Sequence, residues 1–157
     1  MVGKEGVSGL CSVFGSQPNT HQALVMVGGQ ARRIKTAVLR QEFRRVGKLQ
    51  SLLLDYSNRH LMQVSQKVVC ESFHPIEKWL CSWLLMLEDR IRKNQFAITH
   101  EQLSLFLGVY RPTLSTIAKN LRDKGLISYV RGKFFILNRP GLQSIACECY
   151  EAVKSSG

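Results

Sequence analysis

The sequence predicts a mainly α, α+β fold, in which a winged helix-turn-helix domain follows a long helix and a short N-terminal segment of β character. Three patterns support this prediction. Apolar residues recur at helical spacing through residues 48–73, two helices meet at a glycine within residues 101–124, and two short strand patterns occupy residues 127–137. We therefore divide the chain into three parts, residues 1–47, 48–73 and 74–157.

The N-terminal part has the pattern of the end of a larger β domain. Residues 23–27 (ALVMV) predict a buried strand, and Gly28-Gly29 predicts a turn after it. Helical character begins near Thr36, a candidate N-cap for the segment AVLRQEFRR, and Gly47 interrupts it.

Residues 48–73 predict one helix of ~37 Å at ~1.5 Å per residue. A helix of this length with one apolar stripe commonly pairs with a second copy of itself. The alternative is an ordinary core helix that packs within its own chain. The predicted dimer interface consists of Leu49, Leu52, Leu53, Tyr56, His60, Leu61, Val64 and Val68.

Pro75 is expected to end this helix after His74, because a residue before proline avoids the α conformation. A new helix is predicted from Ile76 to about Lys93, with its aromatic residues in the core. The C-terminal segment RPGLQSIACECYEAV predicts a single closing helix from about Pro140.

Between these helices lies the most informative segment of the chain. A short amphipathic helix over residues 101–107 meets Gly108, and a second helix from about Pro112 to Lys124 stops at Gly125. Two strands, residues 127–130 and 134–137, follow, joined by Arg131-Gly132-Lys133. In a winged helix-turn-helix the second helix lies in the DNA major groove, so this segment predicts DNA binding.

The second helix presents polar residues opposite a predicted buried face of Leu114, Ile117, Ala118 and Leu121. Arg111 suits a bidentate contact with guanine O6 and N7. The predicted base-reading residues are Arg111, Pro112, Thr113, Ser115 and Thr116. The predicted phosphate-binding residues are Lys119, Asn120, Arg131 and Lys133.

The charge of the chain agrees with an anionic partner. Its 157 residues include 22 Lys and Arg against 11 Asp and Glu, a net charge of +11. Seven basic residues lie between positions 111 and 139 against Asp123 alone: Arg111, Lys119, Arg122, Lys124, Arg131, Lys133 and Arg139. The alternative is that they form a merely solubilising face. We favour that reading for the basic residues of the segment 32–48.

Metal binding and catalysis are not predicted. The five cysteines form no regular framework and are expected to be free thiols in a cytoplasmic protein. Cys147 and Cys149, placed on a helix, would point apart, and neither CxxC spacing nor a nearby histidine completes a zinc set. His21, His60, His74 and His100 show no ligand spacing. We expect no cofactor, and we find no pattern typical of an enzyme, a signal peptide or a membrane span.

The stretch from Phe73 to Tyr150 resembles the C-terminal domain of the Crp/Fnr family of bacterial transcription regulators. The resemblance lies in IEKWLCSWLLMLEDRI, in ITHEQLSLFLGVYRPTLSTIAKNLRDKGLISYVRGKFFILNRPGL and in the terminal ACECY. Residues 48–73 are similar to the family's dimerisation helix. Residues 1–47 resemble only the last part of its cyclic-nucleotide-type β-roll, in KEGVSGL and HQALVMVGGQARRI, and are expected to be a partial β-roll remnant.

Two departures from the family pattern bear on function. Where nucleotide-binding members hold the cyclic phosphate with an Arg-Ser/Thr-Ala run, this chain has His21-Gln22-Ala23, which disfavours cyclic-nucleotide binding. Nor do the cysteines match the N-terminal cluster of oxygen-sensing members. In the recognition helix Arg111 matches a base-contacting arginine, whereas Pro112 and Thr116 replace a glutamate and a second arginine. The target site should therefore differ from the family's best-known operators.

The sequence thus predicts a homodimeric regulator that binds a palindromic site on double-stranded DNA, with RNA polymerase a further partner and no membrane involved. The alternative is a protein-interaction module, which pairs through its long helix with a full-length relative and modulates that relative.

Overall fold

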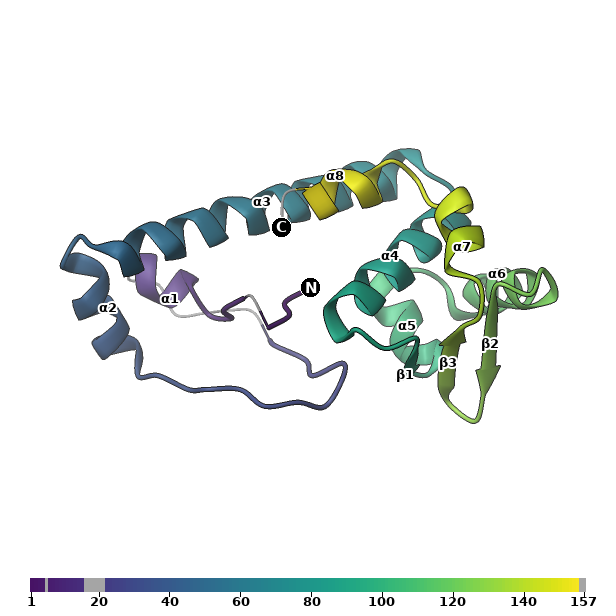
Figure 1. The fold of residues 1–157 in the computed structure, drawn as a ribbon, viewed down its shortest axis with the longest axis horizontal. Coiled ribbons are helices and arrows are strands. Elements are labelled where there is room, and N and C mark those ends of the chain that lie inside the picture. The colour runs from purple at the N-terminus through teal and green to yellow at the C-terminus, as the bar shows by residue number, and fades with distance from the viewer. Residues whose placement is uncertain (5, 16–21, 156–157) are drawn as a thin grey trace. The chain divides into compact units, whose positions relative to one another are not determined.

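The computed structural model describes residues 1–4, 6–15 and 22–155. The chain divides into two compact units, residues 1–63 and 64–157. Helix α3 (Lys48–Phe73) contributes to both units (Figure 1). Its two ends coincide with the predicted ends, where Gly47 precedes it and Pro75 follows it.

The C-terminal unit has the predicted mixed fold, mainly helical with a small antiparallel sheet of order β1-β3-β2. Its helices after α3 are α4 (Ile76–Ile91), α5 (His100–Leu107), α6 (Arg111–Asp123), α7 (Arg139–Ile145) and α8 (Cys149–Ser155). Its strands are β1 (Gln95–Ala97), β2 (Ile127–Val130) and β3 (Lys133–Ile136). The winged helix-turn-helix is therefore present in the predicted order.

The core of this unit gathers around α4. Leu80, Leu84 and Leu85 of α4 are fully buried, together with Leu114 of α6 and Phe134 of β3. Trp83 is buried, which confirms its predicted place in the core, and its ring stacks on that of Phe106 with centroids 6.3 Å apart. Burial of these apolar surfaces supplies the main stabilisation of the helix-turn-helix.

Local chemistry fixes the ends of the two central helices. Thr99 and Gln102 form a capping box at the start of α5, and Gly108 ends α5 in the left-handed conformation at φ 65°. Pro112 lies in the first turn of α6, where a missing N–H costs no helical hydrogen bond. Both helices begin one residue earlier than the predicted starts.

The hairpin between β2 and β3, here called the wing, has a tighter turn than predicted. Val130 pairs with Lys133, so Arg131 and Gly132 alone form the turn, both with positive φ (49° and 77°). Two positive φ values are typical of a type I′ hairpin turn, in which glycine at the second position is favoured. Strand β3 therefore begins one residue earlier than expected. Strand β1, which pairs with β3, was not predicted.

The C-terminal segment differs from the expected single helix. Helix α7 ends at Ile145 and α8 begins at Cys149, because Ala146 leaves the helical conformation with ψ 152°. Cys147 therefore lies in a connection between two helices rather than on one. The expectation that helical geometry separates Cys147 from Cys149 was wrong.

The N-terminal unit holds two further helices, α1 (Cys11–Phe14) and α2 (Thr36–Arg44). Its small core consists of Leu10, Val13, Leu39 and Leu53, with Phe43 and Tyr56 packed against it. Arg40 joins the two helices by donating hydrogen bonds to the carbonyl oxygens of Ser12 (2.7 Å) and Gly15 (2.8 Å).

The buried strand predicted over residues 23–27 is wrong. None of the described residues in 1–47 forms a strand, and the side chains of Leu24 and Val25 are exposed. A strand buries its apolar face only against neighbouring strands, and the described residues of this segment offer none. Thr36 is the first residue of α2 rather than its N-cap, which is Lys35.

Candidate nucleic-acid interface

Helix α6 has one buried and one exposed face, as predicted. Leu114, Ala118 and Leu121 point into the core, and Ile117 is half-buried. The exposed residues of the helix include Arg111, Pro112, Thr113, Thr116, Lys119 and Asn120. Six of the seven proposed DNA-contacting residues of this helix are therefore accessible.

The seventh of these residues is Ser115. Its hydroxyl and that of Thr116 both have hydrogen-bond partners inside the protein. The Ser115 side chain is half-buried, with its Oγ 3.0 Å from His100 Nδ1. The Thr116 hydroxyl donates a hydrogen bond to the carbonyl oxygen of Pro112 at 3.1 Å. A DNA contact through either hydroxyl has to compete with these bonds, so Arg111 and Thr113 are the better placed polar candidates for base contacts.

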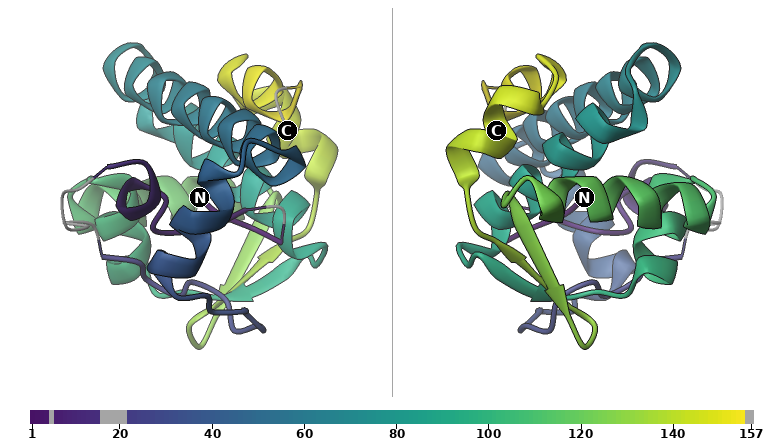
Figure 2. Two further views of the ribbon diagram at one scale, coloured as in Figure 1. Left: turned by 90° about the vertical axis from the view of Figure 1, so that its left-hand side faces the viewer. Right: turned by 90° about the vertical axis from the view of Figure 1, so that its right-hand side faces the viewer.

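The tip of the wing carries two more exposed cations. Arg131 occupies the turn and Lys133 begins β3, and both are exposed. Figure 2, in its right-hand view, shows α6 and the wing on the same side of the C-terminal unit, with the wing tip pointing away from the helices. Helix α6 and the wing can therefore face the same partner.

The seven basic residues between positions 111 and 139 fall into two sets. The paired set, Arg122, Lys124 and Arg139, makes ion pairs with acidic side chains. The outward set is Arg111, Lys119, Arg131 and Lys133. Within the described part of the chain, no member of the outward set pairs with a carboxylate.

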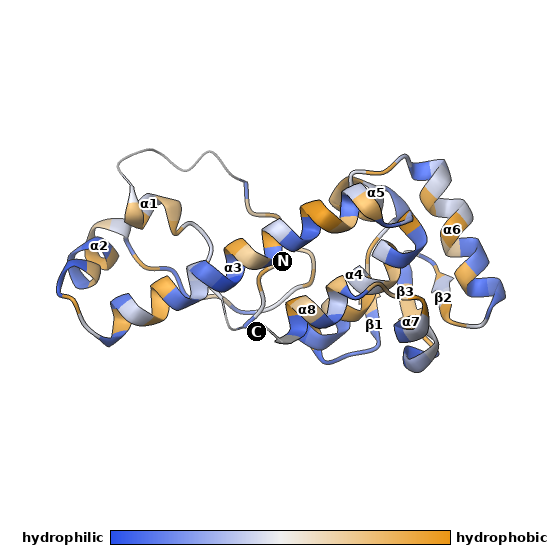
Figure 3. Ribbon diagram, turned by 90° about the horizontal axis from the view of Figure 1, so that it is seen from above, coloured by the Kyte–Doolittle hydropathy of each residue, from blue (hydrophilic) through white to orange (hydrophobic). Residues whose placement is uncertain are grey.

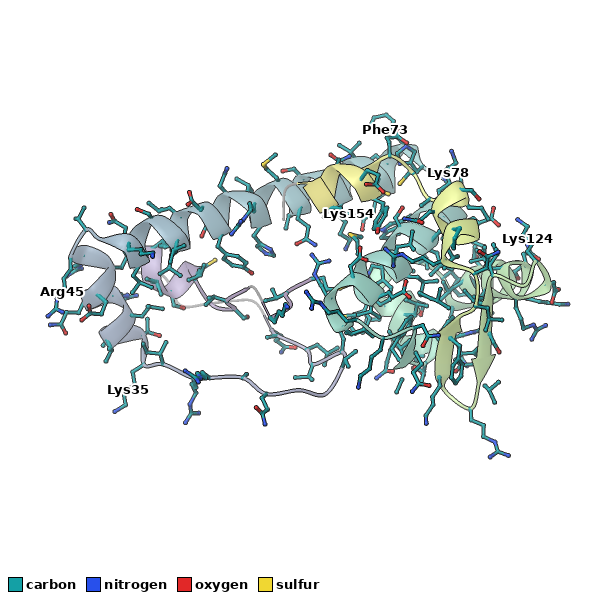
Figure 4. All side chains as sticks on the ribbon, viewed as in Figure 1. Lys35, Arg45, Phe73, Lys78, Lys124 and Lys154 are labelled. Carbon is teal, nitrogen blue, oxygen red and sulfur yellow. The ribbon has the colours of Figure 1, made fainter. Side chains whose placement is uncertain are left out.

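The paired set connects α6 and α7 mainly to α4. Lys124 Nζ lies 2.9 Å from Glu77 Oε1, at the position labelled in Figure 4. Arg139 pairs with Glu88 and, at 2.7 Å, with Asp89. Arg122 pairs with its neighbour Asp123 at 3.2 Å. Each of these three cations therefore has a carboxylate partner, whereas the outward set has none among the described residues.

His100, which the sequence did not single out, connects the recognition helix to the wing. Its ring lies 4.3 Å from the Tyr129 ring and 5.5 Å from the Phe134 ring, between centroids, while Nδ1 faces Ser115. Burial lowers the pKa of His100, and the nearby charge of Arg111 lowers it further. No spacing pattern marks a residue of this kind, because its partners come from three separate elements.

The predicted dimer residues on α3 are not all available to a partner. Leu53 is buried and Tyr56 partly buried in the chain's own core, and His60 stacks on Tyr56 with centroids 5.9 Å apart. Other predicted members remain exposed, namely Leu49, Leu52, Leu61, Val64 and Val68.

Leu54, which was not predicted, is also exposed. At 100° per residue it falls on one side of α3 with three predicted members, and we call this set the exposed stripe: Leu54, Leu61, Val64 and Val68. Figure 3 shows apolar and polar bands alternating along this helix. The stripe therefore combines a spacing of seven residues with exposure, as a dimer seam requires.

Two other expectations from the sequence bear on ligands. His21, at the position of the family's phosphate-binding run, lies outside the described residues. The expectation that no histidine lies near the terminal cysteines was wrong, because His74 is close to Cys149 in space.

Among the described helices, none has both the length and the apolar character needed to cross a membrane.

Comparison with known proteins agrees with this geometry. Residues 80–145 match the Crp-like helix-turn-helix domain family. A regulator of the Crp/Fnr family from Eubacterium rectale has a similar structure, with a TM-score of 0.57 and 19% identity over 70% of this chain and 51% of its own. A CRP/FNR family regulator from Thermus thermophilus gives a TM-score of 0.59 and 20% identity over 63% of this chain and 54% of its own.

A second Thermus thermophilus regulator, of the CRP family, gives a TM-score of 0.57 and 17% identity over 65% of this chain and 56% of its own. No curated protein sequence matches the chain significantly. The chain spans about half the length of these three solved structures. At such low identity their likeness establishes the fold, and the domain match confirms the Crp/Fnr resemblance seen in the sequence.

Proposed function

We propose that this chain, whose residues 80–145 match the Crp-like helix-turn-helix domain family, is a sequence-specific DNA-binding transcription regulator. One observation carries the proposal: of the seven basic residues between positions 111 and 139, the four without a carboxylate partner among the described residues lie on the exposed face of α6 and on the wing. A second helix that follows a tight turn is the element that enters the major groove in this motif.

Within this proposal the two parts of the surface have different tasks. Arg111, at the first position of α6, reads a guanine edge, since the N-terminal residues of a recognition helix approach the bases. Lys119, Arg131 and Lys133 bind phosphates, which adds affinity and salt dependence with little sequence preference. The role is one of binding and positioning, and we assign no residue of this surface to catalysis.

We further propose that the regulator acts as a homodimer through the exposed stripe of α3. Two copies paired along α3 would carry two recognition helices, and half-sites centred ~34 Å apart would follow. The proposed operator is accordingly palindromic. The seven-residue spacing of Leu54, Leu61 and Val68 supports this pairing, because such a repeat keeps one face of each helix toward its partner.

Selection of random duplex DNA at two salt concentrations tests the DNA-binding proposal. We expect the purified protein to enrich a palindrome, and Arg111→Ala to relax preference at one position of each half-site by ~1–3 kcal/mol. Lys124→Ala serves as the matched control, because its ammonium pairs with Glu77. Salt-sensitive binding that enriches no sequence would contradict sequence-specific recognition.

The mass of the chain in solution tests the dimer. We expect Leu61→Glu to convert dimers to monomers, because it places a charge within the exposed stripe. Met62→Glu is the matched control, since Met62 is also exposed but lies off the stripe. A wild-type chain that stays monomeric until a full-length Crp/Fnr relative is added would instead identify a protein-interaction module.

A further inference from the structure

Four potential metal ligands from two distant segments meet in the C-terminal unit. Cys70 lies in the last turn of α3 and His74 one turn later, just before Pro75. Cys147 and Cys149 come from the connection between α7 and α8 and from the first position of α8. Figure 1 shows α8 beside the C-terminal part of α3, which is how residues so far apart in sequence come together.

The four ligand atoms lie close enough together to bind a single metal ion. The three thiol sulfurs and a ring nitrogen all lie within 4.8 Å of one another. Cys70 Sγ is 3.4 Å from Cys147 Sγ, and Cys149 Sγ is 3.5 Å from His74 Nδ1. Ligands at ~2.0–2.3 Å from a central zinc ion are ~3.3–3.8 Å apart in a tetrahedron, which these two pairs match.

The surroundings of the cluster have the features of a closed structural site. Cys70, Cys147 and Cys149 are buried, and the His74 side chain is 15% exposed. Four protein ligands leave no open coordination position, which is typical of structural rather than catalytic zinc. The ligand atoms are also too close together for an iron–sulfur cluster, whose ligands bind different iron atoms.

Neighbouring polar groups orient the ligands. The Glu148 carboxylate lies 3.2 Å from His74 Nε2, so the ring can direct Nδ1 toward the thiols while Nε2–H faces a carboxylate. This is the usual outer partner of a metal-bound histidine. Gln66 donates a hydrogen bond to Cys149 Sγ at 3.0 Å, and Ser82 Oγ lies 3.2 Å from Cys147 Sγ.

We propose that Cys70, His74, Cys147 and Cys149 bind one zinc ion, which fastens the C-terminal segment to the end of α3. Three thiolates and one imidazole are a recognised zinc ligand set. The ion joins residues 147–149 to the junction of α3 and α4, where the helix-turn-helix domain begins. The proposal does not depend on DNA binding, and its test uses no DNA.

Metal analysis of the full chain, purified without chelators, is the first test. We expect one zinc per chain, and after replacement by Co²⁺ the visible absorption of a tetrahedral cobalt–thiolate site. Cys149→Ser should lose the zinc. Cys11→Ser, which alters an exposed thiol outside the cluster, should keep it. Folded protein that retains no zinc and gives no cobalt spectrum would overturn the proposal.

Glu148→Gln provides a variant with little risk of misfolding, because the Glu148 side chain is 80% exposed. We expect it to remain folded, by circular dichroism, and to bind zinc ~10–100-fold more weakly in a competition titration. Unchanged affinity would overturn the assigned histidine orientation.

Two other results would overturn the zinc assignment itself. A mass lower by two hydrogens, with no metal bound, would show a Cys70–Cys147 disulfide instead, since these sulfurs are neighbours. Iron and acid-labile sulfide in the purified protein would show an iron–sulfur cluster.

Zinc removal by a chelator should lower the melting temperature, and re-addition should restore it.

Discussion

The outward and paired sets of basic residues are indistinguishable in the sequence yet differ in the structure. Both lie within residues 111–139 and belong to the same positive segment. The paired set is held by acidic residues, three of which lie on α4, whereas the outward set meets no carboxylate among the described residues. The number of basic residues in the segment 111–139 therefore overstates the positive charge available to a partner, because ion pairs with acidic residues, most of them outside the segment, compensate part of it.

Arg139 has more side-chain partners than the other members of the paired set. Besides its two carboxylate partners it donates a hydrogen bond to the Tyr150 hydroxyl at 2.8 Å, and that hydroxyl donates to Asp89 at 2.7 Å. Burial, followed by the hydrogen bond to Asp89, raises the pKa of Tyr150 to about 12. The network joins α4, α7 and α8, which indicates a structural role for an arginine that the sequence grouped with the DNA-binding cations.

Replacing Arg139 should give the largest stability effect within the comparison. Arg139→Ala leaves Glu88 and Asp89 without their cationic partner, although Asp89 keeps its hydrogen bond from Tyr150, and we expect a loss of about 2 kcal/mol in the free energy of unfolding by urea titration. Arg122→Ala, the matched control, removes an exposed pair and should cost less than ~1 kcal/mol. Equal effects would mean that the two arginines are equally dispensable to the fold.

Sequence patterns predicted the helices and strands better than the contacts between them. Helix α3 and the order of helix, turn, helix and wing follow from apolar spacing, Gly108 and Gly125, all of which act locally. The pairing of Arg139 with α4 depends on residues 50 positions apart. No local pattern specifies such a contact.

The candidate sites show the same limit. The exposed face of α6 was predicted because helical periodicity separates it from Leu114 and Leu121. The cysteine and histidine cluster was not, because its halves are 77 residues apart and the break at Ala146 reorients Cys147. The wrongly predicted strand at residues 23–27 is the opposite case. These residues have a strand-forming pattern, but the described residues of the segment 1–47 offer no neighbouring strand to pair with it.

Salt dependence separates the two sets more finely. Lys133→Ala should weaken binding to all DNA sequences and reduce the slope of log K against log salt by about one unit, since one phosphate contact is lost. Lys124→Ala should leave that slope nearly unchanged, because its ammonium pairs with Glu77. Fluorescence anisotropy with labelled duplex at several salt concentrations measures both. A similar fall in slope for both variants would show that the ion pair with Glu77 does not withhold Lys124 from DNA.

The smallest expected effect concerns how the charge of Arg111 acts inside the protein. The pKa of His100 in the folded chain is below its ordinary value of 6.5, first through burial and then through Arg111. As the pH falls through about 6.5, the unfolded chain takes up a proton that folded His100 does not. The contribution of His100 to stability is therefore present above pH 6.5 and is lost as the pH falls toward the lowered pKa.

We expect His100→Phe to remove this part of the pH dependence, measured as urea unfolding free energies between about pH 5 and 8. Phenylalanine keeps a ring against Tyr129 and Phe134 but binds no proton. Ser115→Ala, which removes the hydrogen-bond partner and not the ring, should keep the wild-type slope, because burial and Arg111 are the leading causes of the shift. Because the charge of Arg111 also lowers the pKa of His100, Arg111→Ala should reduce the slope of unfolding free energy against pH. If this variant leaves the wild-type slope unchanged, the guanidinium does not act on His100. Burial alone would then account for the lowered pKa of His100.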